Sequence, residues 1–208
     1  MVNPFDHETA YYDAWFERHG EIYRAELEAV RAMVPGGVED GLEVGVGTGR
    51  FAYPLGIEVG LDPSLEMLML AAKRGVVPVA GVGEAMPFTG GSFSLVLMVT
   101  SLCFCNDPPR VLSETRRVLR RLGRVVVAII DRDSPLGACY QKRKQTSPFY
   151  RDARFLGSKE LLSMLKDAGF SGISACQTLF GNDIASISLD VRDGVGEGGF
   201  AVVSGVRG

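Results

Sequence analysis

The chain has 208 residues, of which 46% are hydrophobic and 23% are charged, and its formal net charge is −3. These values fit one globular domain over residues 1–208 and are typical of a soluble, cytoplasmic protein. Because the chain is acidic, and its longest apolar stretch is about half of the roughly 20 residues that cross a membrane, neither a nucleic-acid nor a membrane partner is expected.

Apolar and aromatic residues at helical spacing predict two helices, at 6–19 and 21–33, which form an N-terminal helical arm over residues 1–34. Strands and helices then alternate along the chain. Strands are predicted at Gly41–Val46, Glu58–Asp62, Val76–Val82, Ser94–Thr100 and Arg124–Asp131, and helices between them at Arg50–Tyr53, Ser64–Arg74 and Pro109–Leu122. This alternation predicts an α/β fold, a Rossmann-like open and mostly parallel sheet with helices on both faces.

After the fifth strand the pattern predicts helices at Ser134–Gln145 and Ser158–Ala168, then strands at Gly172–Phe180 and Gly199–Val206. No helical pattern connects these last two strands, so an antiparallel pair is expected, which makes seven strands in all. The segment 132–157 is not needed to complete the sheet and is expected on the substrate side. Its aromatic and arginine residues suit either the wall of a pocket for an aromatic or anionic acceptor, or a lid that simply packs.

A glycine-rich loop follows the first predicted strand, where residues 42–51 read Leu-Glu-Val-Gly-Val-Gly-Thr-Gly-Arg-Phe. Glycines let a ligand lie directly against main-chain N–H groups. In a dinucleotide fingerprint that starts at Gly45, the third glycine would stand at Arg50. The carboxylate of Glu43 suits a ligand with an ammonium and a sulfonium group better than a pyrophosphate. The loop therefore favours S-adenosylmethionine over a nicotinamide cofactor.

Three further motifs accompany this loop: Gly60-Leu61-Asp62-Pro63-Ser64 after the second strand, Gly83-Glu84-Ala85-Met86-Pro87-Phe88 after the third, and Leu122-Gly123-Arg124 before the fifth. With them the chain resembles the class I S-adenosylmethionine-dependent methyltransferases. Tyr12-Asp13-Ala14-Trp15-Phe16 is typical of the small-molecule group that includes the ubiquinone and menaquinone C-methyltransferases. Val82 departs from the family pattern, which has an acid for adenine there, and Leu122 stands where many relatives have proline.

The resemblance implies a methyl transfer from S-adenosylmethionine to a small-molecule acceptor, with release of S-adenosylhomocysteine. It assigns the ribose to Asp62 and adenine to the backbone of 83–85, with help from Glu84, and it places Tyr12 and Trp15 over the methionine end. The alternative for these aromatics is that they only dock the arm on the core. The cofactor-binding residues expected on this basis are Tyr12, Glu43, Gly45, Gly47, Asp62, Pro63, Gly83, Glu84, Ala85 and Thr100.

No residue is required as a catalyst, because the sulfonium methyl is already activated; a base is needed only if the acceptor must lose a proton. Asp131 and His19 are the candidates carried forward, together with His7 and Asp133, although the two aspartates fit a helix cap or turn equally well. The four cysteines lack a zinc spacing, so no metal is expected. A non-catalytic S-adenosylmethionine-binding regulator and a nicotinamide-dependent oxidoreductase are the alternative functions. The acceptor, its attacking atom and the oligomeric state stay open.

Overall fold

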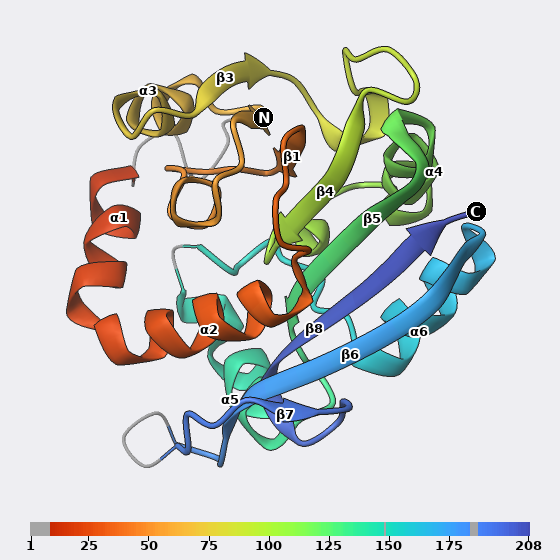
Figure 1. Ribbon diagram of the computed structural model, residues 1–208. Coiled ribbons are helices and arrows are strands. Elements are labelled where there is room, and N and C mark those ends of the chain that lie inside the picture. Colours follow the sequence, from red (N-terminus) through yellow and green to blue (C-terminus); the bar gives the residue numbers. More distant parts are fainter. Residues whose placement is uncertain (1–8, 148, 184–186) are drawn as a thin grey trace.

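The computed structural model describes residues 9–147, 149–183 and 187–208, and an eight-stranded sheet forms the centre of this part of the chain (Figure 1). The strands lie in the order β3-β2-β1-β4-β5-β8-β6-β7. Their bounds are β1 Gly41–Val44, β2 Val59–Asp62, β3 Val77–Ala80, β4 Phe93–Val99, β5 Leu119–Ile130, β6 Phe170–Phe180, β7 Arg192–Asp193 and β8 Gly198–Arg207.

Strands β1 to β5 pair in parallel, whereas β8 runs antiparallel between β5 and β6. The predicted Rossmann-like, mostly parallel sheet and the antiparallel pair at its end are therefore confirmed. The count of seven strands was one too low. A two-residue strand, β7, lies in the polar, glycine-rich stretch between β6 and β8 and pairs with Cys176 and Gln177 of β6.

Helices cover both faces of the sheet, as predicted (Figure 1). Within the part of the chain that the structure describes, no helix is long and apolar enough to cross a membrane. The helices are α1 Thr9–Arg18, α2 Gly20–Met33, α3 Leu65–Lys73, α4 Pro108–Val118, α5 Pro135–Arg143 and α6 Ser158–Asp167, with short 3-10 helices η1 Tyr53–Leu55, η2 Gly83–Ala85, η3 Leu102–Phe104 and η4 Lys144–Thr146.

The core has two halves, because alternate residues of a strand point to opposite faces of the sheet. From β4, Leu95 and Leu97 pack in the half that contains the buried residues of α1, α2 and α3. Val96 and Met98 pack in the other half, against α4 and α6. The helices of the first half are the ones that come to lie beside the glycine loop.

The largest departures from the predicted boundaries lie after the glycine loop and between α4 and β5, which begins at Leu119 rather than Arg124. No α-helix forms at 50–53: after the glycine loop the chain makes only the 3-10 turn η1 and reverses at Gly56, whose φ is 70°. Burial of Phe51 and Ala52 on the core holds this compact turn in place. Helix α4 ends at Val118 rather than Leu122, because Leu119 already pairs with Phe93 of β4.

Candidate functional site

The glycine loop, residues 45–49, leaves β1 through backbone conformations that favour glycine. Gly45, Gly47 and Gly49 have φ values of 73°, 52° and 80°. Space is equally restrictive, since a Cβ on Gly45 would lie 2.3 Å from the Cβ of Ser101. The loop therefore runs close against the chain that follows β4, at the carboxyl ends of the parallel strands.

Asp62 ends β2 beside this loop, and only 8% of its surface is exposed. Its Oδ2 accepts a hydrogen bond from the backbone N–H of Gly47 at 2.9 Å, and its Oδ1 accepts one from the N–H of Ser64 at 2.9 Å. Pro63, between them, is exposed. The two bonds fix the orientation of the carboxylate next to the glycine loop, where the resemblance predicts a ribose.

Glu43 lies on β1 and is 1% exposed. Its Oε2 is buried with no hydrogen-bond partner among the described residues. Burial, helped by the nearby charge of Asp62, raises the pKa of Glu43 well above its ordinary value, although a backbone hydrogen bond from Ala52 opposes this. A buried, unsatisfied carboxyl is costly. A ligand with an ammonium group would supply both the donor and the opposite charge, so the methionine end of S-adenosylmethionine fits this position.

The 3-10 helix η2, residues 83–85, follows β3 at the same edge of the sheet. Its glycine, Gly83, is buried, and a Cβ there would lie 3.1 Å from Val111 of α4. The Oε1 of Glu84 accepts hydrogen bonds from the N–H groups of Asn106 at 2.8 Å and Asp107 at 3.3 Å. Glu84 therefore connects η2 to the start of α4. Its predicted help in adenine binding stays a prediction, and exposed Val82 offers no polar group there.

Thr100 follows β4 with a φ of 49°, which is rare for a β-branched residue. Its N–H donates to the carbonyl oxygen of Ala128 on β5 at 2.9 Å, and its own carbonyl oxygen accepts from the Cys103 thiol at 3.2 Å. These bonds hold the strained conformation. Thr100 is thereby held beside β5, and the next residue, Ser101, lies against Gly45 of the glycine loop.

Helix α1 is attached to the glycine loop through Asp13. The carboxylate of Asp13 accepts from Thr48 Oγ1 at 2.7 Å, from Arg50 Nε at 2.9 Å and from Arg74 Nη2 at 2.7 Å. Burial alone would raise the pKa of Asp13, but these hydrogen bonds hold it well below its usual range. Tyr12 lies over the loop, because a Cβ on Gly47 would be 3.7 Å from its ring. The arm therefore covers the glycine loop.

An aromatic cavity of about 60 Å³ lies beside Thr100, between the arm and the segment 132–157. Seven of its lining residues are aromatic, and the arm and the segment both contribute some of them. The lining residues are Tyr12, Trp15, Phe16, Glu26, Phe51, Val99, Thr100, Ile130, Tyr140, Phe149 and Tyr150. Tyr12 lines this cavity and lies over Gly47, and Thr100 lines it next to Ser101, which lies against Gly45, so the two parts of the site adjoin.

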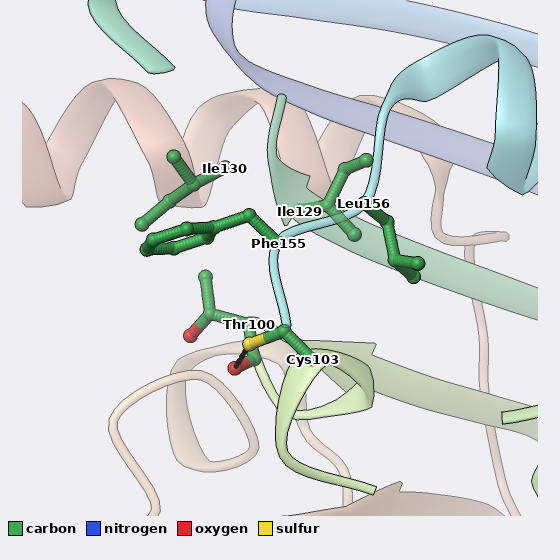
Figure 2. A pocket seen from close by; sticks show the side chains of 6 residues that line it. All are labelled: Thr100, Cys103, Ile129, Ile130, Phe155 and Leu156. Atoms are coloured by element: carbon green, nitrogen blue, oxygen red, sulfur yellow. Dashed lines mark hydrogen bonds between the residues drawn. The ribbon is translucent and has the colours of Figure 1, made fainter. Parts of the chain in front are cut away.

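A second, apolar pocket of about 10 Å³ lies on the other side of Thr100 and Ile130. Figure 2 shows the ring of Phe155 between Ile130 and Thr100, with Cys103 pointing toward the Thr100 carbonyl. A space of this size scarcely holds one water molecule. This pocket is therefore a packing gap among the apolar side chains that surround Thr100.

Of the predicted bases, Asp131, Asp133 and His19 lie in the described part of the chain, and none of the three lines the aromatic cavity. Asp131 is fully buried, and its Oδ1 accepts from the N–H groups of Asp133 at 3.1 Å and Ser158 at 3.0 Å, so it joins the start of α6 to the end of β5. These bonds favour the alternative given for Asp131 from the sequence, a helix-capping or turn role rather than that of a base. His19 stacks on Trp15 with ring centroids 4.7 Å apart, at the junction of α1 and α2. His7 lies outside the described residues. Among the residues that the structure describes, no group of acids, histidines and cysteines could hold a metal ion.

Glu26 is the functional candidate that the sequence analysis missed. It lies on α2, among the buried residues Ile22, Ala25, Ala29 and Val30, and it lines the aromatic cavity. A signal was present, since an acid interrupts the apolar face of an amphipathic helix at this position. That signal alone did not reveal which other elements would surround it.

Known proteins resemble the chain in sequence and in structure. A family model described as a methyltransferase domain matches residues 42–127. An uncharacterized protein of Methanocaldococcus jannaschii is 44% identical over 98% of both chains, and a demethylmenaquinone methyltransferase of Renibacterium salmoninarum is 37% identical over 50% of this chain and 46% of its own. A crystal structure from Thermotoga maritima, described as an S-adenosylmethionine-dependent methyltransferase and possible histamine N-methyltransferase, covers 100% of both chains with 42% identity and a TM-score of 0.93. The chain therefore belongs to the S-adenosylmethionine-dependent methyltransferases.

Proposed function

We propose that this methyltransferase acts on a small molecule, which it holds in the aromatic cavity next to the glycine loop. The observation that carries this proposal is that Tyr12 lines the cavity and also lies over Gly47 of the glycine loop, while Thr100, which lines the cavity too, precedes Ser101, the residue that lies against Gly45. A methyl group presented near Thr100 would thus lie at the boundary of the cavity. The arm and the segment 132–157 both line the cavity, which supports the prediction that this segment lies on the substrate side.

S-adenosylmethionine supplies a methyl group that is already activated by its sulfonium, so the protein has to align the acceptor and exclude water. We assign the ammonium of the cofactor to Glu43, the ribose to Asp62 and adenine to the backbone of 83–85. The glycines 45 and 47 allow the close approach, and Tyr12 and Thr100 border the methionine end. The contacts of the Asp62 carboxylate and the unsatisfied Oε2 of Glu43 support this assignment.

The size and lining of the cavity support a small acceptor. About 60 Å³ is room for only a few water molecules, so the part of the acceptor that is enclosed must be small. Two similar proteins have names that refer to small acceptors, histamine and demethylmenaquinone. The 42% identical protein spans this whole chain, so its possible acceptor is the first one to test.

The test measures formation of S-adenosylhomocysteine by the purified full-length chain with a panel of amines, phenols, thiols and acidic carbon compounds, histamine among them. Calorimetric titrations with S-adenosylmethionine, S-adenosylhomocysteine and NAD accompany it. We expect binding of both methionine ligands and turnover with at least one acceptor. Binding of NAD alone would refute the cofactor assignment, and turnover only with a protein or nucleic acid would refute the small-molecule acceptor.

A further inference from the structure

Glu26 is a carboxylic acid in an otherwise uncharged cavity wall. Among the described residues that line the cavity, none is a lysine, arginine or histidine. Its carboxyl group makes no hydrogen bond or ion pair with any residue in the described ranges 9–147, 149–183 and 187–208, in contrast to that of Asp13, which accepts hydrogen bonds from three side chains. An acid that faces a cavity without a counter-charge is costly unless something else satisfies it. The acceptor is the molecule placed to do so.

The rings around Glu26 suit a cation as well as an apolar group. Tyr12 makes edge contacts with Phe16 at 5.3 Å and with Phe149 at 5.6 Å between ring centroids, and Tyr140 makes one with Tyr150 at 5.8 Å. Aromatic faces attract ammonium groups, most strongly where water is excluded. A neutral acceptor would gain from the rings but would leave the acid unpaired. A cationic acceptor would be stabilised by both.

Burial raises the pKa of Glu26 to about 8. The groups that face it from the neighbouring elements are the phenols of Tyr12 on α1, Tyr140 on α5 and Tyr150, whose pKa values are all raised, chiefly by burial. These phenols are neutral near pH 7, so Glu26 is the group that can exchange a proton there. An alkylammonium has a pKa of about 10.4, so a carboxylate with a raised pKa is a better base toward it than an ordinary one.

On the basis of the proposed function, we propose that the methyl acceptor is a small primary or secondary amine, which Glu26 binds as an ammonium ion and then deprotonates. The ammonium first gives one proton to the Glu26 carboxylate, which frees the nitrogen lone pair. The nitrogen then forms a bond to the methyl carbon while the carbon–sulfur bond breaks and its electron pair stays on sulfur. The products are the N-methylammonium ion, S-adenosylhomocysteine and protonated Glu26, whose proton leaves to solvent when the positive charge of the next ammonium ion binds beside it.

The experiment compares Glu26→Gln with Glu28→Gln, which removes an exposed acid two residues along the same helix. The probes are 2-phenylethylamine and its alcohol counterpart, 2-phenylethanol, with histamine as a second amine. Calorimetry in the presence of S-adenosylhomocysteine gives acceptor binding, and S-adenosylhomocysteine release in a separate assay gives turnover. We expect the wild type to bind an amine at least tenfold more tightly than the alcohol and to methylate only amines.

In Glu26→Gln we expect amine turnover to fall at least 100-fold and the preference for amine over alcohol to disappear, while the affinity for S-adenosylmethionine stays within twofold of the wild type. Glu28→Gln is expected to behave as the wild type does. Equal amine turnover in Glu26→Gln, or wild-type turnover only with hydroxyl, thiol or carbon acceptors, would overturn the amine inference and leave the proposed function standing. The amine-to-alcohol binding ratio of the wild type tests the inference even if the variant does not fold.

Discussion

The position of Glu26 in the cavity predicts how its replacement changes the stability of the protein with pH. Burial raises the pKa of this carboxyl from 4.5 to about 8. At 1.36 kcal/mol per pKa unit, ionising it in the folded protein costs about 5 kcal/mol more than in the unfolded chain. The folded state binds the proton more tightly, so the contribution of Glu26 to stability is fully present below pH 4.5 and is lost as the pH rises to about 8.

The glutamine of Glu26→Gln does not titrate. The difference between the free energies of unfolding of the wild type and of the variant therefore isolates the contribution of the Glu26 carboxyl. Between pH 6.0 and 8.5 the variant should gain about 2–3 kcal/mol relative to the wild type. Urea unfolding at both pH values, followed through the fluorescence of the single tryptophan, measures the difference. The exposed-acid variant Glu28→Gln should follow the wild-type curve. A difference between Glu26→Gln and the wild type that is constant with pH would refute an apolar environment for this carboxyl.

Asp62→Ala should weaken S-adenosylmethionine binding by about 10- to 100-fold in calorimetry, because charged hydrogen bonds to a buried acceptor are lost; unchanged affinity would assign the ribose elsewhere. Gly45→Ala should destabilise the fold by about 2 kcal/mol or more in urea unfolding, since its Cβ would lie 2.3 Å from that of Ser101 at a φ of 73°; adding Ser101→Gly should recover part of the loss, and no recovery would show that the clash is not the cause. Asp13→Asn should make the arm more susceptible to limited proteolysis, because the ion pairs of Asp13 with Arg50 and Arg74 are weakened. An unchanged cleavage pattern would show that other contacts hold the arm.

The strand ends could be predicted from the sequence, because a parallel sheet gathers its carboxyl ends at one edge. Glu43, Asp62 and Thr100 lie there for that reason, and each follows or belongs to an apolar run that is easily recognised. The cavity could not be predicted in the same way. Its walls come from α1, α2, β4, β5 and the segment 132–157, and their meeting depends on tertiary packing rather than on any local pattern.

Helix boundaries failed where tertiary contacts outweighed local preference. Pro54, directly after the predicted helix 50–53, already disfavours its continuation, and the buried residues Phe51 and Ala52 hold a tight turn there instead. Tertiary contacts also decide the role of Asp131, which was predicted as a base. Its position after a strand was right, but its carboxylate accepts a hydrogen bond from the backbone of Ser158 and the residue does not line the cavity, a detail that spacing does not encode.

The missing helix after β1 has a consequence for which nucleotides compete for the site. An α-helix that begins at a glycine loop would direct the positive end of its dipole at the ligand and attract phosphates. Here only η1 follows, and the N–H groups of the loop are already engaged: those of Gly45 and Val46 with the Leu61 carbonyl, and that of Gly47 with Asp62. The loop thus offers a phosphate neither a dipole nor these amides, and it repels one through nearby carboxylates. ATP should therefore be a poor competitor of a positively charged cofactor at this site.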